Sequence, residues 1–96
     1  MHCFLAVVAL LLGFALKIST NEWLWLILNI SFVLAGELIN TAIELLVDFV
    51  SPGYNEKAGR IKDMTAGAVT VIALNAFISG LIIFLPKLLH LFAGAR

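Results

Sequence analysis

The chain has 96 residues and a formal net charge of zero; 62% of its residues are hydrophobic, 12% are charged, and the mean hydropathy is +1.10. Soluble domains carry about 25% charged residues, so this composition excludes an ordinary soluble protein and indicates a membrane protein. The six basic side chains are dispersed, which excludes the clustered basic face of a nucleic-acid-binding protein. We expect a single domain over residues 1–96. Because three helices enclose little interior, we also expect an oligomer.

The first apolar run extends from Cys3 to Leu16, and Lys17 can reach the membrane surface with its long side chain. A run this short suits the core of a signal peptide as well as a membrane span. No basic residue precedes it and no A-x-A cleavage pattern follows it, so a short span over about residues 2–18 is favoured. Residues 19–22, STNE, predict a polar turn.

The second apolar run begins at Trp23 and Trp25, which are typical of interfacial anchors, and its helical pattern continues to Val50. A helix over residues 23–50 would rise about 42 Å, whereas the hydrocarbon core of a bilayer is about 30 Å thick. The last two turns are therefore expected in the headgroups or in the cytosol.

Residues 51–63, SPGYNEKAGRIKD, form the longest hydrophilic segment, and their Pro-Gly pair predicts a loop. The third predicted span, over residues 64–85, is rich in small side chains that allow close helix packing, and Pro86 and Lys87 mark its end. Three basic residues lie on each side of the predicted spans, so their number does not decide the orientation. Their density in the loop places residues 51–63 in the cytosol.

Four polar residues of the second span share one face, within an arc of about 80°, and we call them the polar stripe: Glu37, Asn40, Glu44 and Asp48. If Trp23 lies at the outer boundary, Glu37 lies about 21 Å inward and Glu44 about 31 Å inward. An acid at the membrane centre costs about 2.5–3.5 kcal/mol and is usually functional. The cost falls mainly on Glu37.

The polar stripe has two interpretations. In one, Asn40 and Thr41 bond across helices, Glu44 and Asp48 are interfacial, and Glu37 is a protonated acid bonded to a neighbour. In the other, Glu37 is a desolvated general base or acid and Glu44 holds Mg²⁺, which together suit chemistry between a lipid and a phosphate donor.

The hydrophilic segment supplies groups that complement an acidic site. Arg60 and Lys62 can neutralise phosphate oxygens, and Asp63 is a candidate cap for the third helix. Asn75 and Ser79 are expected to hydrogen-bond between helices. No Gly-rich phosphate loop is present, which excludes the common soluble kinase folds.

Two motifs in register, E-x-x-N-T-A-I-E-x-x-x-D and A-G-R-I-K-D-M-T-A-G-A-V, resemble the small integral-membrane lipid kinases of bacteria, the prokaryotic diacylglycerol kinase and undecaprenol kinase family. The resemblance implies an all-α homotrimer with three transmembrane helices per chain. It implies a multi-pass protein of the bacterial inner (cytoplasmic) membrane, with its active site on the cytosolic side. The implied reaction transfers the γ-phosphoryl group of ATP, with Mg²⁺, to the hydroxyl of diacylglycerol or undecaprenol.

The resemblance also implies roles for single residues. Glu37 would bind the lipid and accept the proton of its hydroxyl, Asn40 would orient the site, and Glu44 would bind the metal and the nucleotide. Ala66 would line the lipid pocket. The remaining residues implied to meet ATP are Asp48, Tyr54, Asn55, Lys62 and Asp63.

Two departures from the family pattern stand out. Members generally begin with an amphipathic surface helix and an acid that is the second carboxylate of the metal site, whereas this chain begins inside its first apolar run. Glu22 belongs to the opposite membrane face, so the second carboxylate is not identified. We therefore expect these 96 residues to insert and oligomerise but to phosphorylate lipid poorly. Asn55 stands where some members have histidine.

Two other function classes remain open. The first is a non-catalytic membrane assembly or accessory protein, in which the polar stripe only packs helices. The second is an ion pathway, which predicts acids throughout the membrane depth; the acids here gather toward one end, so this class ranks last.

Overall fold

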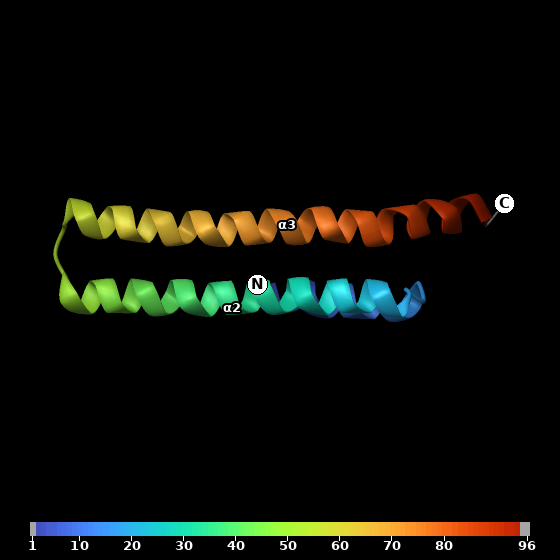
Figure 1. The fold of residues 1–96 in the computed structure, drawn as a ribbon, viewed down its shortest axis with the longest axis horizontal. Helices are drawn as coiled ribbons and strands as arrows, with labels where there is room; N and C mark the ends of the chain where they lie inside the picture. Colours follow the sequence, from blue (N-terminus) through green and yellow to red (C-terminus); the bar gives the residue numbers. More distant parts are fainter. Residues whose placement is uncertain (1, 95–96) are drawn as a thin grey trace.

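The computed structural model describes residues 2–94, and this part of the chain is all-helical (Figure 1). Its helices are α1 (His2–Ala15), α2 (Thr20–Val50) and α3 (Glu56–Gly94). α2 and α3 form a long antiparallel hairpin, and α1 lies against the N-terminal half of α2 (Figure 1). The predicted all-α fold is confirmed. We call the end at residues 51–55 the closed end and the end where α2 starts the open end.

Two of the helices are long and apolar enough to cross a membrane, α2 with 31 residues and α3 with 39. α1 has 14 residues and is a shorter apolar helix. It ends at Ala15 rather than near residue 18, because Lys17 takes a left-handed conformation with a φ of 52°, which ends a helix. The length criterion therefore supports two of the three predicted spans.

The predicted polar turn at residues 19–22 is instead the start of α2. Ser19 caps the helix: its Oγ accepts a hydrogen bond from the backbone N of Glu22 at 3.1 Å, and Glu22 Oε1 accepts one from the backbone N of Ser19 at 2.9 Å. One turn on, Trp23 stacks at a tilt on Phe14, with ring centroids 5.0 Å apart. A Cβ on Gly13 would lie 2.7 Å from the Trp23 ring, so glycine lets α1 pack closely here.

The connection between α2 and α3 is shorter than the predicted loop, because α3 begins at Glu56. Asn55 caps this helix, and its Oδ1 accepts hydrogen bonds from the backbone N atoms of Lys57 at 2.9 Å and Ala58 at 3.2 Å. The prediction that Asp63 caps the third helix is wrong, since Asp63 lies two turns inside α3. α3 also continues through Pro86, beyond the predicted end of the third span.

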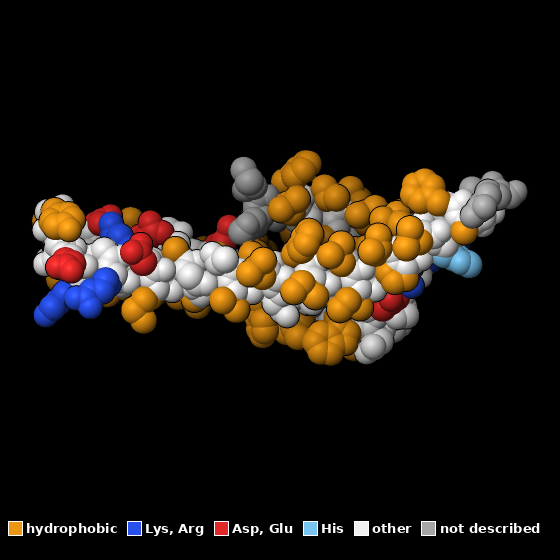
Figure 2. Space-filling view, turned by 90° about the horizontal axis from the view of Figure 1, so that it is seen from above, with side chains coloured by type: hydrophobic (Ala, Val, Ile, Leu, Met, Phe, Trp, Pro, Cys, Tyr) orange, Lys and Arg blue, Asp and Glu red, His pale blue; other side chains and the backbone are white. Residues whose placement is uncertain are grey.

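Little of the molecule is buried. The buried apolar core is a small cluster near the open end, formed by Ile18, Leu26, Ile83 and Phe84. Many large apolar side chains along all three helices are exposed, and Figure 2 shows hydrophobic side chains over much of the surface, with charged groups mainly toward the two ends. Such a surface suits contact with lipid or with other copies of the chain.

Candidate functional site

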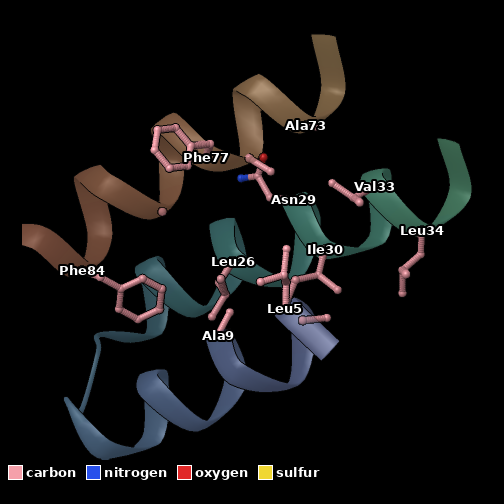
Figure 3. Close-up of a pocket in the computed structure, with 13 residues that line it drawn as sticks. Leu5, Ala9, Leu26, Asn29, Ile30, Val33, Leu34, Ala73, Phe77 and Phe84 are labelled. Atoms are coloured by element: carbon pink, nitrogen blue, oxygen red, sulfur yellow. The ribbon is translucent and has the colours of Figure 1, made fainter. Parts of the chain in front are cut away.

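An apolar pocket lies where α1 packs against one flank of the hairpin (Figure 3). α1 contributes Leu5 and Ala9, and Figure 3 shows both facing α2. The hairpin residues that line the pocket include Leu26, Ile30, Val33 and Leu34 of α2 and Ala73, Ala76, Phe77, Gly80 and Phe84 of α3. α1 starts beside the middle of α2, so it covers this flank only along the half nearest the open end (Figure 1).

The polar stripe continues the pocket wall of α2 toward the closed end. Positions 26, 30, 33, 37, 40, 44 and 48 follow one another at steps of three or four residues, which keeps them on one helix face. The same spacing on α3 runs from pocket residues 84, 80, 77 and 73 through 69 to Ala66 and Lys62. One flank of the hairpin is therefore apolar beside α1 and polar beyond it.

Glu37 lies where the apolar part of this flank meets the polar part. It is half-buried, and it follows the pocket residues Val33 and Leu34 by one helical turn. The preceding residue, Gly36, faces α3 so closely that a Cβ there would lie 2.9 Å from Cδ1 of Ile72. Glu37 thus follows a residue at which α2 and α3 approach each other closely.

Asn40 and Glu44 form a hydrogen-bonded pair. Asn40 Nδ2 donates to Glu44 Oε1 over 2.6 Å, which fixes the direction of that carboxylate. Asn40 Oδ1 is buried and has no hydrogen-bond partner among the described residues. A buried acceptor without a partner is costly, so this oxygen favours a donor or a cation beside Glu44.

Asp48 and Lys62 join the two helices near the closed end. Lys62 Nζ donates to Asp48 Oδ1 over 2.5 Å, and both side chains remain partly exposed. Ala66, predicted to line a lipid pocket, is exposed one turn beyond Lys62 on the same face of α3. The structure therefore brings Lys62 and Ala66 to the flank of the polar stripe.

Three residues predicted to meet ATP lie apart from these contacts. Tyr54 is 98% exposed in the connection at the closed end. Asn55 is occupied as the cap of α3. Asp63 is exposed on α3, about 100° around the helix from Lys62.

The described residues contain no group of three or more His, Cys, Asp or Glu side chains gathered as a metal site. Glu44 and the free acceptor of Asn40 nevertheless offer the oxygen ligands that Mg²⁺ prefers. Mg²⁺ commonly takes only one or two carboxylates and completes its shell with substrate phosphates and water. This pair fits such a metal.

Two structural residues were not singled out from the sequence. Asn29 is buried, and its Oδ1 accepts a hydrogen bond from Asn75 Nδ2 at 2.8 Å. In the sequence it is a single amide within an apolar run, and this is the feature that could have pointed to its role. The expected interhelical bond of Asn75 is confirmed. Gly36 was missed because a glycine in an apolar helix gives no sign of which neighbour it faces.

Residues 1–84 match the family model described as prokaryotic diacylglycerol kinase. The chain belongs to the prokaryotic diacylglycerol kinase family. It is 42% identical over 87 residues to an undecaprenol kinase of Bacillus subtilis (strain 168), covering 91% of this chain and 71% of that protein. The predicted family is confirmed, and its members are named as lipid kinases, which are phosphotransferases.

Other relatives carry the diacylglycerol kinase name. One from Synechocystis sp. is 37% identical over 91 residues, covering 94% of this chain and 52% of that protein. One from Escherichia coli (strain K12) is 39% identical over 54 residues, covering 56% of this chain and 44% of that protein. The chain thus spans about half the length of these two diacylglycerol kinases. No solved structure matches the chain.

Proposed function

We propose that the chain is a membrane lipid kinase that transfers the γ-phosphoryl group of ATP, with Mg²⁺, to the hydroxyl of a lipid. The observation that carries this proposal is the position of Glu37, half-buried between an apolar pocket and a polar stripe. A lipid bound along this flank would place its apolar chain in the pocket and its hydroxyl beside Glu37. The family membership agrees with this assignment.

In the proposed reaction Glu37 accepts the proton of the lipid hydroxyl as its oxygen attacks the γ-phosphorus. The new oxygen–phosphorus bond forms while the bond from the γ-phosphorus to the bridging oxygen breaks, and ADP leaves with that oxygen. A lipid hydroxyl is a weak acid, so a base at its depth lowers the barrier. Of the three carboxylates in the polar stripe, Glu37 lies nearest the apolar pocket.

The other residues of the flank bind and orient. Lys62 neutralises phosphate oxygens, and Asp48 holds its ammonium group in place. The hydrogen bond from Asn40 holds the Glu44 carboxylate, and Glu44 and Asn40 Oδ1 would be ligands for the metal. Mg²⁺, when bound, offsets the charge that develops on the phosphates. We also propose nucleotide contacts for Tyr54, Asn55 and Asp63, and a lipid contact for Ala66.

The proposed acceptor is diacylglycerol or undecaprenol, because each offers a hydroxyl on an apolar chain and the relatives carry both names. We further propose a homotrimer in the bacterial inner membrane. The small buried core and the exposed apolar side chains support an oligomer. The basic residues Lys57, Arg60 and Lys62 near the closed end support a cytosolic site.

The test is transfer of radiolabelled γ-phosphate from ATP to diacylglycerol and to undecaprenol in mixed micelles, with and without Mg²⁺. We expect slow, Mg²⁺-dependent labelling of at least one lipid by the native chain, in line with the poor activity expected from its sequence, and near-complete loss of that labelling in Glu37→Gln. Glu56→Gln is the matched control, because Glu56 is an exposed acid in the first turn of α3. A folded, oligomeric chain that labels neither lipid would refute the kinase and favour an accessory role.

A further inference from the structure

Within the described part of the chain, three of the polar contacts between α2 and α3 lie one at each end of the hairpin and one within the helices. They measure 3.0 Å at the open end, 2.8 Å within the helices and 2.5 Å near the closed end. In that order they pair Glu22 with Lys87, Asn29 with Asn75 and Asp48 with Lys62. All three are made in one and the same register of the two helices.

The contact within the helices differs from the two at the ends. Asn29 is only 6% exposed and faces the apolar pocket, between Leu26 and Ile30 of its own helix (Figure 3). Its Nδ2 donates to the backbone O of Trp25 at 2.9 Å, and its Oδ1 accepts from Asn75 Nδ2. A shift of either helix would leave an amide unpaired at a depth where water cannot replace the bond.

The end contacts tolerate such a shift better. The Lys62 and Asp48 side chains are 38% and 60% exposed, and a lysine side chain turns about four carbon–carbon bonds. The ion pair can therefore follow a small slide of the helices or exchange with water. Between the ends, small residues such as Gly36, Ala73 and Ala76 let the two helices approach closely, and the seating of Ile72 against Gly36 supports the same register as the amide pair.

We propose that Asn29 and Asn75 are positioning residues for the phosphoryl transfer: their hydrogen bond sets the register that holds Lys62 opposite the polar stripe. The positioning role rests on the proposed kinase function. A slide of α3 by one turn would move Lys62 by about 5.4 Å along the stripe. Misplacement of a reacting group by about 1 Å can lower a rate by about 100-fold.

The decisive variant is the double substitution Asn29→Leu/Asn75→Leu in the full chain. Replacing both partners by apolar side chains of similar size is nearly neutral for stability, so this variant stays folded while it loses the register. Asn75→Leu alone leaves Asn29 Oδ1 without its hydrogen-bond donor, so we expect this variant to lose both stability and activity. Asn75→Gln keeps an amide at this position and is the conservative control.

Disulfide formation in a Cys3→Ser background measures the register of α2 and α3 independently of any enzymatic activity. The native pair is Gly36→Cys with Ile72→Cys, because the ideal Cβ of residue 36 already meets the Ile72 side chain. The shifted pairs combine Gly36→Cys and Ile72→Ala with Ala68→Cys or with Ala76→Cys, one turn away in either direction; Ile72→Ala removes the side chain that a Cβ at residue 36 would meet. Mass spectrometry of the cross-linked peptides gives the yield of each pair, and a gel separates disulfides between copies.

In the double-leucine variant we expect the yield of the 36–72 disulfide to fall and the yield of a shifted disulfide to rise. We also expect the rate of phosphate transfer to drop about 100-fold and the KM for MgATP to increase. Asn75→Gln should stay much nearer to the native rate. Unchanged disulfides and native activity in the double variant would overturn the proposal, as would lost activity with an unchanged register. If the native chain transfers no phosphate, the kinase proposal fails with the positioning role, while the disulfides still show whether the amides fix the register.

Discussion

Three carboxylates of one helix occupy different surroundings. Glu37 is half-buried beside the apolar pocket, the Glu44 carboxylate is held by Asn40, and Asp48 is paired with Lys62. Along the polar stripe, Asp48 is the carboxylate farthest from the apolar pocket and Glu37 is the nearest. These positions support the proposed roles of Glu37 as the base beside the lipid pocket and of Glu44 as a metal ligand.

Substituting Glu37 by Gln removes basicity but keeps the size of the side chain and its hydrogen bonding. We expect kcat to fall by about two to four orders of magnitude, the usual contribution of a general base, with little change in MgATP affinity. Radiolabelled transfer gives kcat, and calorimetry gives the affinity. Retained transfer would contradict the base assignment. Loss of binding and of the oligomer together would favour a role in helix packing.

Glu44→Gln should weaken the use of Mg²⁺. The variant removes the charge next to Asn40 but can keep the 2.6 Å hydrogen bond, so the oligomer should remain intact. We expect the Mg²⁺ concentration for half-maximal transfer to rise by about tenfold, as for loss of about 1.4 kcal/mol of binding. An Mg²⁺ titration of the transfer rate measures this shift. Unchanged metal dependence in an active variant would contradict the assignment.

At the scale of elements, the pattern of the sequence predicts more of the helix interiors than of the helix ends. The apolar runs place the bodies of α2 and α3, and the spacing of Glu37, Asn40, Glu44 and Asp48 predicts their common face. The helix ends depend on which of several cap-forming side chains accepts hydrogen bonds from the first free backbone N–H groups. Ser19 and Asn55 do so here, whereas Asp63 does not.

Contacts between elements are the other part that the sequence did not reveal. Asn75 was expected to bond across helices, but its partner Asn29 became evident only once the hairpin register was known. The pairing of Lys62 with Asp48 depends on that same register. Spacing along one helix does not determine how a second helix is aligned beside it.

Substitutions of Asn55 can distinguish its role as the cap of α3 from a role in binding the nucleotide. Asn55→Ala should destabilise the start of α3 by about 1 kcal/mol, while Asn55→Asp keeps an acceptor for the backbone N atoms of Lys57 and Ala58. Hydrogen exchange of residues 56–60 measures the cap. If Asn55→Asp protects these amides as the native chain does yet raises the KM for MgATP, the side chain also meets the nucleotide. An unprotected helix start in Asn55→Asp would contradict the cap.

The close approach at Gly36 can be tested with a matched glycine. Gly36→Val should force α2 from α3 and destabilise the chain by about 1–3 kcal/mol, because the added side chain meets Ile72. Gly67→Val should change stability much less, since no atom lies within 4 Å of the position of a Cβ there. Unfolding in mixed micelles followed by circular dichroism measures both. Ile72→Ala should restore Gly36→Val, and equal losses at both glycines would contradict a specific contact.

The whole molecule has too little interior to bury its own apolar surface. Large side chains such as Phe32, Leu38, Phe49 and Phe77 are more than half exposed, while the buried apolar core stays near the open end. Lipid can cover part of this surface. A polar stripe in contact with lipid would be costly, so neighbouring copies are the better cover for that flank.

For the proposed homotrimer, we expect the native chain to have three times its 10.4 kDa mass when released from micelles into the mass spectrometer. The Asn29→Leu/Asn75→Leu variant should keep this mass, because its substitutions concern contacts within one chain. A monomer at concentrations that support phosphate transfer would contradict the homotrimer.

The bond between Asn29 and Asn75 also bears on how the chain enters a membrane during synthesis. Each amide alone would add to the free energy of transferring its helix from the translocation channel into lipid. The connection at residues 51–55 is short, so the two helices can meet while both are still beside the channel. An order of insertion follows: α2 would wait for α3, and the hairpin would partition as one unit with its amides already paired.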